Sequence, residues 1–355
     1  MTGTSLKLTA YFAERERVGH RFLTDALFDL FAQRRVATSV MLRGIAGFGR
    51  RRVIRTDESL TLSEDPSVAI TAVDAPEVIS ALADEVVAMT TSGLITLERA
   101  RLLDDGVLPA AGVDTVKLTV YVGRNRRVEG VPAYKAVCDL LRRNDVDGAW
   151  VFLGVDGTAH GDRRRAHFLS RNIDVPLMIL AVGSADEISR SVADLQAVLE
   201  HPLITVERAE LCKRDGHLLA TPPALPGTDA NDRSLWQKLM VFTSEDQRYG
   251  GTPIHRALVR RIWASGAASG ATVLRGVWGF EGDREPHGDR LFQLGRQVPV
   301  MTVIVGDPGS IAATFPIVDE LTAGHGLVTS EMVPALITAD TDSRPSGIDL
   351  ADYPY

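Results

Sequence analysis

Cysteine is almost absent from this sequence, because its 355 residues include only Cys138 and Cys212. Two cysteines are too few for a disulfide-stapled scaffold, and their spacing matches no zinc motif. The sequence has no uncharged apolar run of about 18 residues, and it does not start with a basic segment followed by an apolar one. We therefore expect a cytoplasmic protein without a signal peptide that does not insert into a membrane.

An excess of positive charge is also missing. The 39 lysines and arginines are outnumbered by 46 acidic residues, and the formal net charge of −7 argues against nucleic acid as a partner. Only five of the basic residues are lysines. The composition, 45% hydrophobic and 24% charged, is that of a folded protein rather than a disordered one. At about 100–200 residues per domain, the length predicts two or three domains.

One sequence pattern occurs three times along the chain. Each copy opens with a Lys-Leu pair in an alternating segment, and an arginine follows ten residues after the lysine. A glycine-rich phrase, a run that starts with proline and a closing Leu-Ile/Val-Thr phrase then recur in the same order. The closing phrase ends at Glu98, Glu207 or Glu331. The copies span residues 5–103, 115–212 and 236–337, and we expect a flexible linker over 213–235 and a flexible tail over 339–355.

Each copy is long enough to have a small core of its own, and its pattern predicts the order β-α-β-β-α-β. In the first copy, period-two alternation predicts a strand over residues 6–12, and three-to-four spacing from Phe22 to Phe31 predicts a helix. A capping box is expected to start the second helix at Asp74–Glu77, and at Ser184–Glu187 in the second copy. This order is that of the ferredoxin-like fold, an α+β fold with both helices on one face of the sheet.

The other face of each sheet has no cover within its own copy. An isolated copy would expose a half-apolar sheet face, which carries Thr9 and Tyr11 in the first copy. Three copies in one chain favour sheets that face a shared axis and close an intramolecular pseudo-trimer. Three independent domains on a string are the alternative, which the short first connection disfavours.

The segment after the second strand of each copy has residues that suit an anion. Glycine amides and nearby guanidinium groups can hold a phosphate or a carboxylate, although no Gly-Lys-Ser/Thr follows, so the segment is not a Walker loop. An ordinary glycine turn before a solvated basic loop is the alternative. Because the copies diverge here, the three sites cannot be equivalent. The predicted ligand-binding residues of this segment are Arg43, Gly44, Gly47, Phe48, Gly49, Arg50, Arg51 and Arg52 in the first copy, Gly154 and Gly157 in the second, and Arg275, Gly276, Gly279 and Phe280 in the third.

The shared lysines Lys7, Lys117 and Lys238 are the other predicted ligand contacts. Each could contact an anion at a domain junction, or could pack its stem over apolar surface with its amine in water. A cation site at His160, Asp162 and His167 is much less favoured than ordinary solvated side chains. No Ser/His/Asp arrangement, Cys/His pair or paired-carboxylate motif is evident, so we predict that the protein is not an enzyme.

In its opening Lys-Leu pair, its glycine-rich phrase and its closing Leu-Ile/Val-Thr phrase, each copy resembles the domain-of-unknown-function family 190 (DUF190), which is similar to the PII signalling proteins. The resemblance covers nearly all of the three copies and is weakest in the second. It implies ferredoxin-like units that bind adenine nucleotides such as ATP, ADP or AMP in the clefts between them. It also implies a mobile loop after the second strand, here residues 44–57, that contacts a target protein, and a membrane transporter or channel as that target.

We therefore expect a PII-like regulatory protein that binds a small anionic ligand at clefts between its domains and contacts a partner through arginine-rich loops. The strongest cleft should involve the first copy. Two alternatives remain open: a metal-binding trimer similar to the CutA proteins, and a structural interaction module that binds no small molecule.

Overall fold

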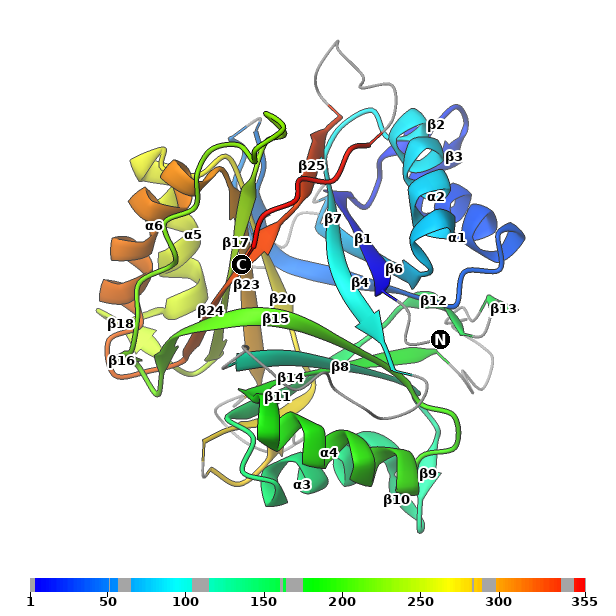
Figure 1. Cartoon of the computed structure of the whole chain (residues 1–355). Helices are drawn as coiled ribbons and strands as arrows, with labels where there is room; N and C mark the ends of the chain where they lie inside the picture. Colours follow the sequence, from blue (N-terminus) through cyan, green and yellow to red (C-terminus); the bar gives the residue numbers. More distant parts are fainter. Residues whose placement is uncertain are drawn as a thin grey trace.

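The computed structural model describes residues 4–50, 52–56, 65–103, 115–159, 162–163, 175–282, 284–288, 298–339 and 348–354. This part of the chain forms a mixed α+β structure with six helices and mainly antiparallel strand pairing. Three pairs of helices lie on the outside, and the strands fill the space between them (Figure 1). No helix of the described residues is long and apolar enough to cross a membrane.

The same element order occurs three times. Repeat 1 consists of β1 (Thr4–Ala13), β2 (Arg17–Val18), β3 (Arg21–Phe22), α1 (Leu23–Gln33), β4 (Thr38–Phe48), β5 (Arg55–Thr56), β6 (Ser67–Asp74), α2 (Pro76–Met89) and β7 (Leu94–Leu102). Repeat 2 consists of β8 (Thr115–Gly123), β9 (Arg127–Val128), β10 (Val131–Pro132), α3 (Ala133–Arg143), β11 (Gly148–Leu153), β12 (Asp156–Ala159), β13 (Asp162–Arg163), β14 (Pro176–Ser184), α4 (Ala185–Val198), β15 (Leu203–Arg214) and β16 (His217–Leu218). Repeat 3 consists of β17 (Trp236–Ser244), β18 (Arg248–Tyr249), β19 (Thr252–Pro253), α5 (Ile254–Ser265), β20 (Ala271–Arg275), β21 (Trp278–Glu281), β22 (His287–Gly288), β23 (Pro299–Gly306), α6 (Pro308–Leu321), β24 (Leu327–Val333) and β25 (Ala335–Thr338).

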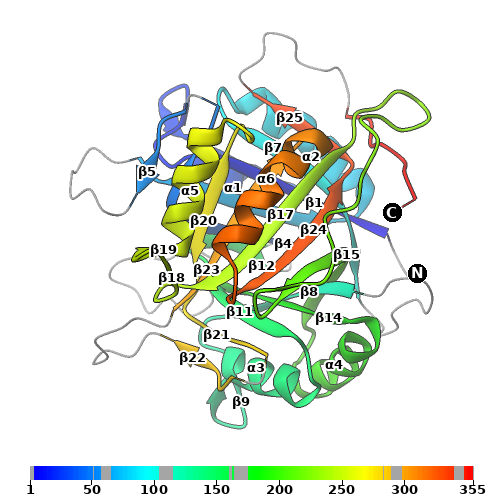
Figure 2. The same ribbon diagram turned by 90° about the vertical axis from the view of Figure 1, so that its left-hand side faces the viewer.

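The first strand of each repeat lies in the middle of its sheet. In repeat 1, β1 pairs with β6 on one side and β7 on the other, and β4 pairs with the far edge of β6. Repeats 2 and 3 follow the same order, with β8 and β17 as the central strands. Figure 2 shows α5 and α6 lying together across one face of the third sheet. Each repeat therefore places its two helices on a single sheet face.

A capping box was predicted at the start of α2 and of α4, and the structure confirms the second of these predictions only. The capping box predicted for α4 is confirmed, because the Ser184 hydroxyl accepts from the Glu187 amide and the Glu187 carboxylate accepts from the Ser184 amide. The box predicted at Asp74 is wrong. Pro76 starts α2, so Ala75 is the N-cap residue, and the Asp74 carboxylate instead accepts from the backbone amides of Ala37 and Ala75.

Each repeat has its own apolar core between helices and sheet, and a fourth core lies between the repeats. Leu8, Leu27 and Ile70 are examples from the core of repeat 1. The fourth core draws on all three repeats, and the stacked rings of Trp150 and Phe242, 3.9 Å apart between centroids, join repeats 2 and 3 within it. The sheet faces that lack helices are thus buried against one another, which removes them from water.

Backbone pairing between repeats reinforces this shared core. The end of each second strand pairs with the start of the second strand of a neighbouring repeat: β4 with β20, β12 with β4, and β21 with β11. The last strands also cross between repeats, as β15 pairs with both β7 and β24, and β25 pairs with β7. Each of the three junctions is therefore held by two strand pairings as well as by side chains.

The predicted linker and tail both contain ordered contacts. Residues 213–235 begin with the end of β15, where buried Lys213 donates to the carbonyl of Asp319 at 2.8 Å. In the tail, buried Ala351 donates its amide to the carbonyl of Pro334, and the Asp352 amide donates to the Asp229 carboxylate. Residues 340–347 and 355 lie outside the described part of the chain.

Candidate functional site

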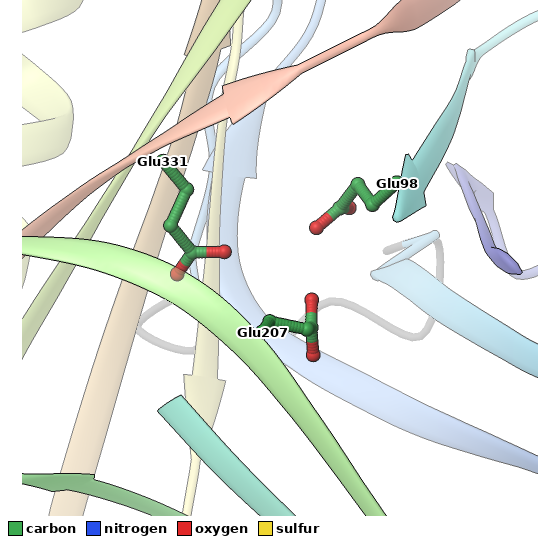
Figure 3. Close-up of side chains that lie close together, drawn as sticks. All are labelled: Glu98, Glu207 and Glu331. Atoms are coloured by element: carbon green, nitrogen blue, oxygen red, sulfur yellow. The ribbon is translucent and has the colours of Figure 1, made fainter. Parts of the chain in front are cut away.

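Three lysines and three glutamates form a closed ring in the middle of the molecule. The lysines Lys7, Lys117 and Lys238 come from the first strands β1, β8 and β17. The glutamates Glu98, Glu207 and Glu331 come from the last strands β7, β15 and β24. Because the first and last strands of a repeat are neighbours, the sheet register sets each lysine directly opposite the glutamate of its own repeat. Figure 3 shows the three carboxylates turned toward one another.

Each lysine also contacts a glutamate of the next repeat. The Lys7 amine is 2.9 Å from the Glu98 carboxylate and contacts Glu207 of repeat 2 as well. Lys117 pairs with Glu207 at 3.2 Å and with Glu331 of repeat 3 at 2.5 Å. Lys238 pairs with Glu331 at 2.9 Å and with Glu98 of repeat 1. Amines and carboxylates therefore alternate around the ring, and its six ion pairs connect every repeat to both of the others.

The ring is buried, so its charged groups are stabilised by one another rather than by water. The lysine and glutamate side chains are at most 9% exposed. Burial alone would raise the pKa of Glu98, but the amines of Lys238 and Lys7 hold that pKa well below its usual range. Burial likewise opposes the charge of Lys238, yet the carboxylates of Glu331 and Glu98 raise its pKa. At Lys117, in contrast, burial lowers the pKa despite the nearby carboxylates of Glu207 and Glu331. With three amines facing three carboxylates, the formal charges of the ring balance.

A metal ion does not fit this ring. Oxygens of Glu98, Glu207 and Glu331 lie within 4.8 Å of one another, a spacing that could suit a cation. Three ammonium groups already neutralise the same carboxylates, and a cation would bring further positive charge into a buried set that is already balanced. The ring is better explained as a junction between the repeats than as a metal centre.

The predicted glycines lie at the strand crossings between repeats. Gly47, Gly157 and Gly279 occupy the same position in the three copies, and in each case a Cβ would collide with a carbonyl oxygen of the neighbouring repeat. That oxygen belongs to Ala271, Ser39 and Ala149, respectively. Gly44, Gly154 and Gly276 also allow close contact, since a Cβ there would meet backbone or side-chain atoms within 3 Å. Close backbone approach thus explains these six glycines, while a Cβ at Gly49 would meet nothing within 4 Å.

The predicted phenylalanines insert into neighbouring cores. Phe48 of repeat 1 is buried in the core of repeat 3, and Phe280 of repeat 3 is buried in the core of repeat 2. The second copy has Thr158 at the same position, where its hydroxyl lies 2.8 Å from the hydroxyl of Ser39 in repeat 1. The divergent residue therefore exchanges an apolar contact for a hydrogen bond at the same kind of junction.

The predicted arginines have separate surroundings. Arg43 and Arg275 each donate to a glutamate of their own repeat, Glu14 and Glu245. Arg52 lies over the ring of Trp263 on α5, and its carbonyl accepts from the Trp263 indole at 2.7 Å. Arg50 is exposed, and Arg51 lies outside the described residues. The structure thus brings Arg52 to the junction of repeats 1 and 3, and not to the lysine ring.

The segments that follow the second strands of the other two repeats also lie on a neighbour's first helix. Arg163 of repeat 2 pairs with Asp156 at 2.7 Å and reaches Asp25 and Asp29 on α1. In repeat 3, Glu285 lies beyond the second strand and pairs with Arg142 on α3 at 3.5 Å, while Trp278 in β21 lies against Tyr134 and Lys135 of the same helix. Within the predicted cation site, His160 and His167 lie outside the described residues, and Asp162 is exposed.

The three glutamates are the functional residues that sequence reasoning left unassigned. Each stands at the end of the closing phrase of its copy, as each lysine stands in the opening phrase. Charges of opposite sign at fixed positions of neighbouring strands were the available signal. The pairing between repeats joins residues 140, 200 and 214 positions apart, which no local pattern reveals.

Comparison with known proteins agrees with the threefold organisation. The sequence profile of the DUF190 family, described as "Uncharacterized ACR, COG1993", matches residues 5–102, 115–211 and 236–335. The chain belongs to the DUF190 family. A "UPF0166 protein" of Aquifex aeolicus (strain VF5) is 34% identical over 96 residues, which are 27% of this chain and 88% of that protein. This relative is about as long as one repeat, whereas the DUF190 chain described here contains three repeats.

Solved structures provide no further argument for this DUF190 protein. A mutant chlorite dismutase from Candidatus Nitrospira defluvii matches with a TM-score of 0.17 at 9% identity, covering 58% of this chain and 92% of that one. A mutant of the ferredoxin protease FusC, in complex with Arabidopsis ferredoxin, matches with a TM-score of 0.18 at 7% identity, covering 90% of this chain and 62% of that one. Scores this low do not support a shared fold.

Proposed function

We propose that this DUF190 protein is a PII-like regulator in which three ferredoxin-like domains form a pseudo-trimer within one chain. In this proposal the protein is not an enzyme. It binds a small anionic ligand, with adenine nucleotides as the first candidates, at a junction between domains, and its arginine-rich loop contacts a partner protein such as a transporter or channel. The observation that carries the proposal is that the segment after each second strand lies on the first helix of a neighbouring repeat.

The junction between repeats 1 and 3 is the best candidate for an anion. It carries Arg52 over Trp263 on α5, with the exposed Arg50 two residues earlier in the chain, and helical spacing sets Arg256 and Arg260 on the same face of α5 as Trp263. Guanidinium groups are suited to phosphate because they donate two parallel hydrogen bonds. The corresponding Arg163 at the junction of repeats 1 and 2 is already neutralised by three aspartates.

A structural module that binds no small molecule is the second candidate. It is favoured by the glycines, since close backbone approach between repeats accounts for Gly47, Gly157 and Gly279 without any ligand. The two candidates differ in one property: only the regulator should gain stability from an anion that binds its native state.

The deciding experiment is a thermal-unfolding screen of the full chain with ATP, ADP, AMP, cyclic nucleotides and inorganic phosphate. A ligand at 100 times its Kd should stabilise the native state by about 2.7 kcal/mol and raise the melting temperature. Arg50→Ala should remove most of that rise, whereas Arg190→Ala on the distant helix α4 should not. If none of these anions shifts the melting temperature, the structural module becomes the better account.

A further inference from the structure

An acidic cluster lies at the junction between repeats 2 and 3. Glu281, the last residue of β21, stands directly opposite Gly148 of β11 in the strand pairing. Asp147 immediately precedes that glycine, and its carbonyl accepts from the Gly282 amide at 2.8 Å. Asp215, in the turn after β15, is next to Gly282, since a Cβ at Gly282 would lie 3.4 Å from the Asp215 carboxylate oxygens. Three carboxylates from three segments thus meet at one strand crossing.

Glu281 is buried at this crossing without a partner for one of its oxygens. It is 7% exposed, and its Oε1 atom has no hydrogen-bond partner. Asp147 is similarly covered, with a side chain that is 9% exposed, but it is held by Arg214, whose guanidinium donates to it at 2.9 Å. An ionised carboxylate without hydrogen-bond donors is costly to bury, whereas a protonated one is much less so.

The charges around the cluster do not neutralise Glu281. Asp215 acts against ionisation of both Glu281 and Asp147, and Glu187 adds to this effect at Asp147. Arg284 and Arg214 favour ionisation of Glu281 and Asp147, respectively. Further charged or titratable groups on the surrounding elements include Lys135 and Arg142 on α3, Glu285 just before β22, His287 in β22, and His325 in the turn before β24.

A compact metal site is not the explanation for this cluster. Among the described residues, carboxylates gather closely enough for a shared cation at Glu98, Glu207 and Glu331, and not at Asp147, Asp215 and Glu281. The cluster is also confined to one junction. The positions that correspond to Glu281 are Gly49 and Ala159 in the other repeats, and those that correspond to Asp147 are Ala37 and Ser269.

We propose that the junction between repeats 2 and 3 is a proton-sensitive joint, closed when Glu281 is protonated and loosened when it is ionised. The other two junctions lack these carboxylates and do not respond. Burial, followed by the charge of Asp215, raises the pKa of Glu281 to about 7. Burial, against the attraction of Arg214, raises the pKa of Asp147 to about 6. The joint therefore titrates near neutral pH.

The direction of the effect follows from proton linkage. Between the ordinary carboxyl pKa of 4.5 and about 7, the folded protein binds a proton at Glu281 that the unfolded chain has released. Stability therefore decreases as pH rises through this window, which is the reverse of the usual behaviour of a salt-bridged carboxylate. Trp278, three residues before Glu281 and in contact with α3, is positioned to report the loosening.

The test compares melting temperatures and tryptophan fluorescence of the full chain between pH 5 and 8.5. In the native protein the melting temperature should decrease by about 2–6 °C across the window. Glu281→Gln should match the native protein at pH 5, exceed it at pH 8.5 and lose the fluorescence transition. Glu285→Gln, a matched control with a side chain that is 89% exposed, should behave like the native protein.

A second variant separates proton binding from mere packing. Asp215→Asn removes a neighbouring negative charge, so it should move the midpoint of the fluorescence transition to lower pH without abolishing it. A merely structural role of Asp215 would leave that midpoint in place. The proposal is overturned if Glu281→Gln has the same pH profile as the native protein, or if it lowers the melting temperature equally at every pH.

Discussion

Lys238 on β17 contacts Glu98 on β7, although 140 residues separate them in the chain. The same lysine pairs with Glu331 of its own repeat at 2.9 Å, and the equivalent residues of the other repeats complete the ring. Each repeat thus contributes one lysine and one glutamate to the ring. Because each lysine also pairs with a glutamate of a neighbour, all six ion pairs can form only when the three sheets face one another.

Removing one ring lysine should be strongly destabilising. Lys7→Met leaves the Glu98 and Glu207 carboxylates buried with fewer counter-charges, and breaking a buried ion pair in this way costs about 3–5 kcal/mol. Equilibrium denaturation in urea measures the change. Lys135→Met is the matched control, since that lysine lies over the Trp278 ring at the surface and its loss should cost about 1 kcal/mol or less. Equal losses in the two variants would show that the ring has no special role.

Replacing the whole ring should be far less harmful than removing one member. With all three lysines changed to methionine and all three glutamates to leucine, no unpaired charge remains, and such exchanges are often neutral or stabilising by about 1–4 kcal/mol. The same denaturation experiment applies. A sixfold variant less stable than Lys7→Met would contradict the view that uncompensated charge is what makes the single change costly.

Acid should weaken the native ring. The pKa of Glu98 is held well below 4.5, so its contribution is present above that value and disappears as pH falls through the lower folded-state pKa. Glu331, whose pKa is also lowered by Lys117 and Lys238 against the effect of burial, should act in the same direction. Melting temperatures between pH 2 and 5 should therefore fall more steeply for the native protein than for the sixfold variant.

The crossing glycines should not tolerate a side chain. Gly47→Ala would place a Cβ 2.5 Å from the carbonyl oxygen of Ala271, and forced overpacking of this kind typically costs about 1–3 kcal/mol. Gly49→Ala, two residues later, meets nothing within 4 Å and should be nearly neutral. If both variants unfold at the same urea concentration, close approach does not explain Gly47.

Part of this architecture could be predicted from the sequence. The repeated phrases disclosed three tandem units, and the hydrophobic periodicities located their helices and main strands. The capping box at Ser184 was correctly predicted, whereas Pro76 moved the start of α2 away from Asp74. Local patterns are informative where a residue's partners lie within a few positions.

The contacts between repeats could not be predicted in the same way. Gly47 and Phe48 belong to a segment whose glycines and arginines are typical of a ligand-binding loop. Their neighbours in the structure, however, belong to repeat 3, more than 200 residues away in the chain. The shared lysines were noticed because lysine is rare, yet their partners depend on sheet register and on which repeats adjoin. A ligand role for the glycines, arginines and lysines stays a prediction.

The most direct test of the ring is a double-mutant cycle on Lys7 and Glu207, the pair that joins repeats 1 and 2. Stabilities of the native protein, Lys7→Met, Glu207→Gln and the double variant give the coupling energy between the two side chains. We predict a coupling of about 2–3 kcal/mol, the upper part of the range for residues in direct contact. Single-variant losses that add to within about 0.5 kcal/mol would show that the two repeats are not joined through this pair.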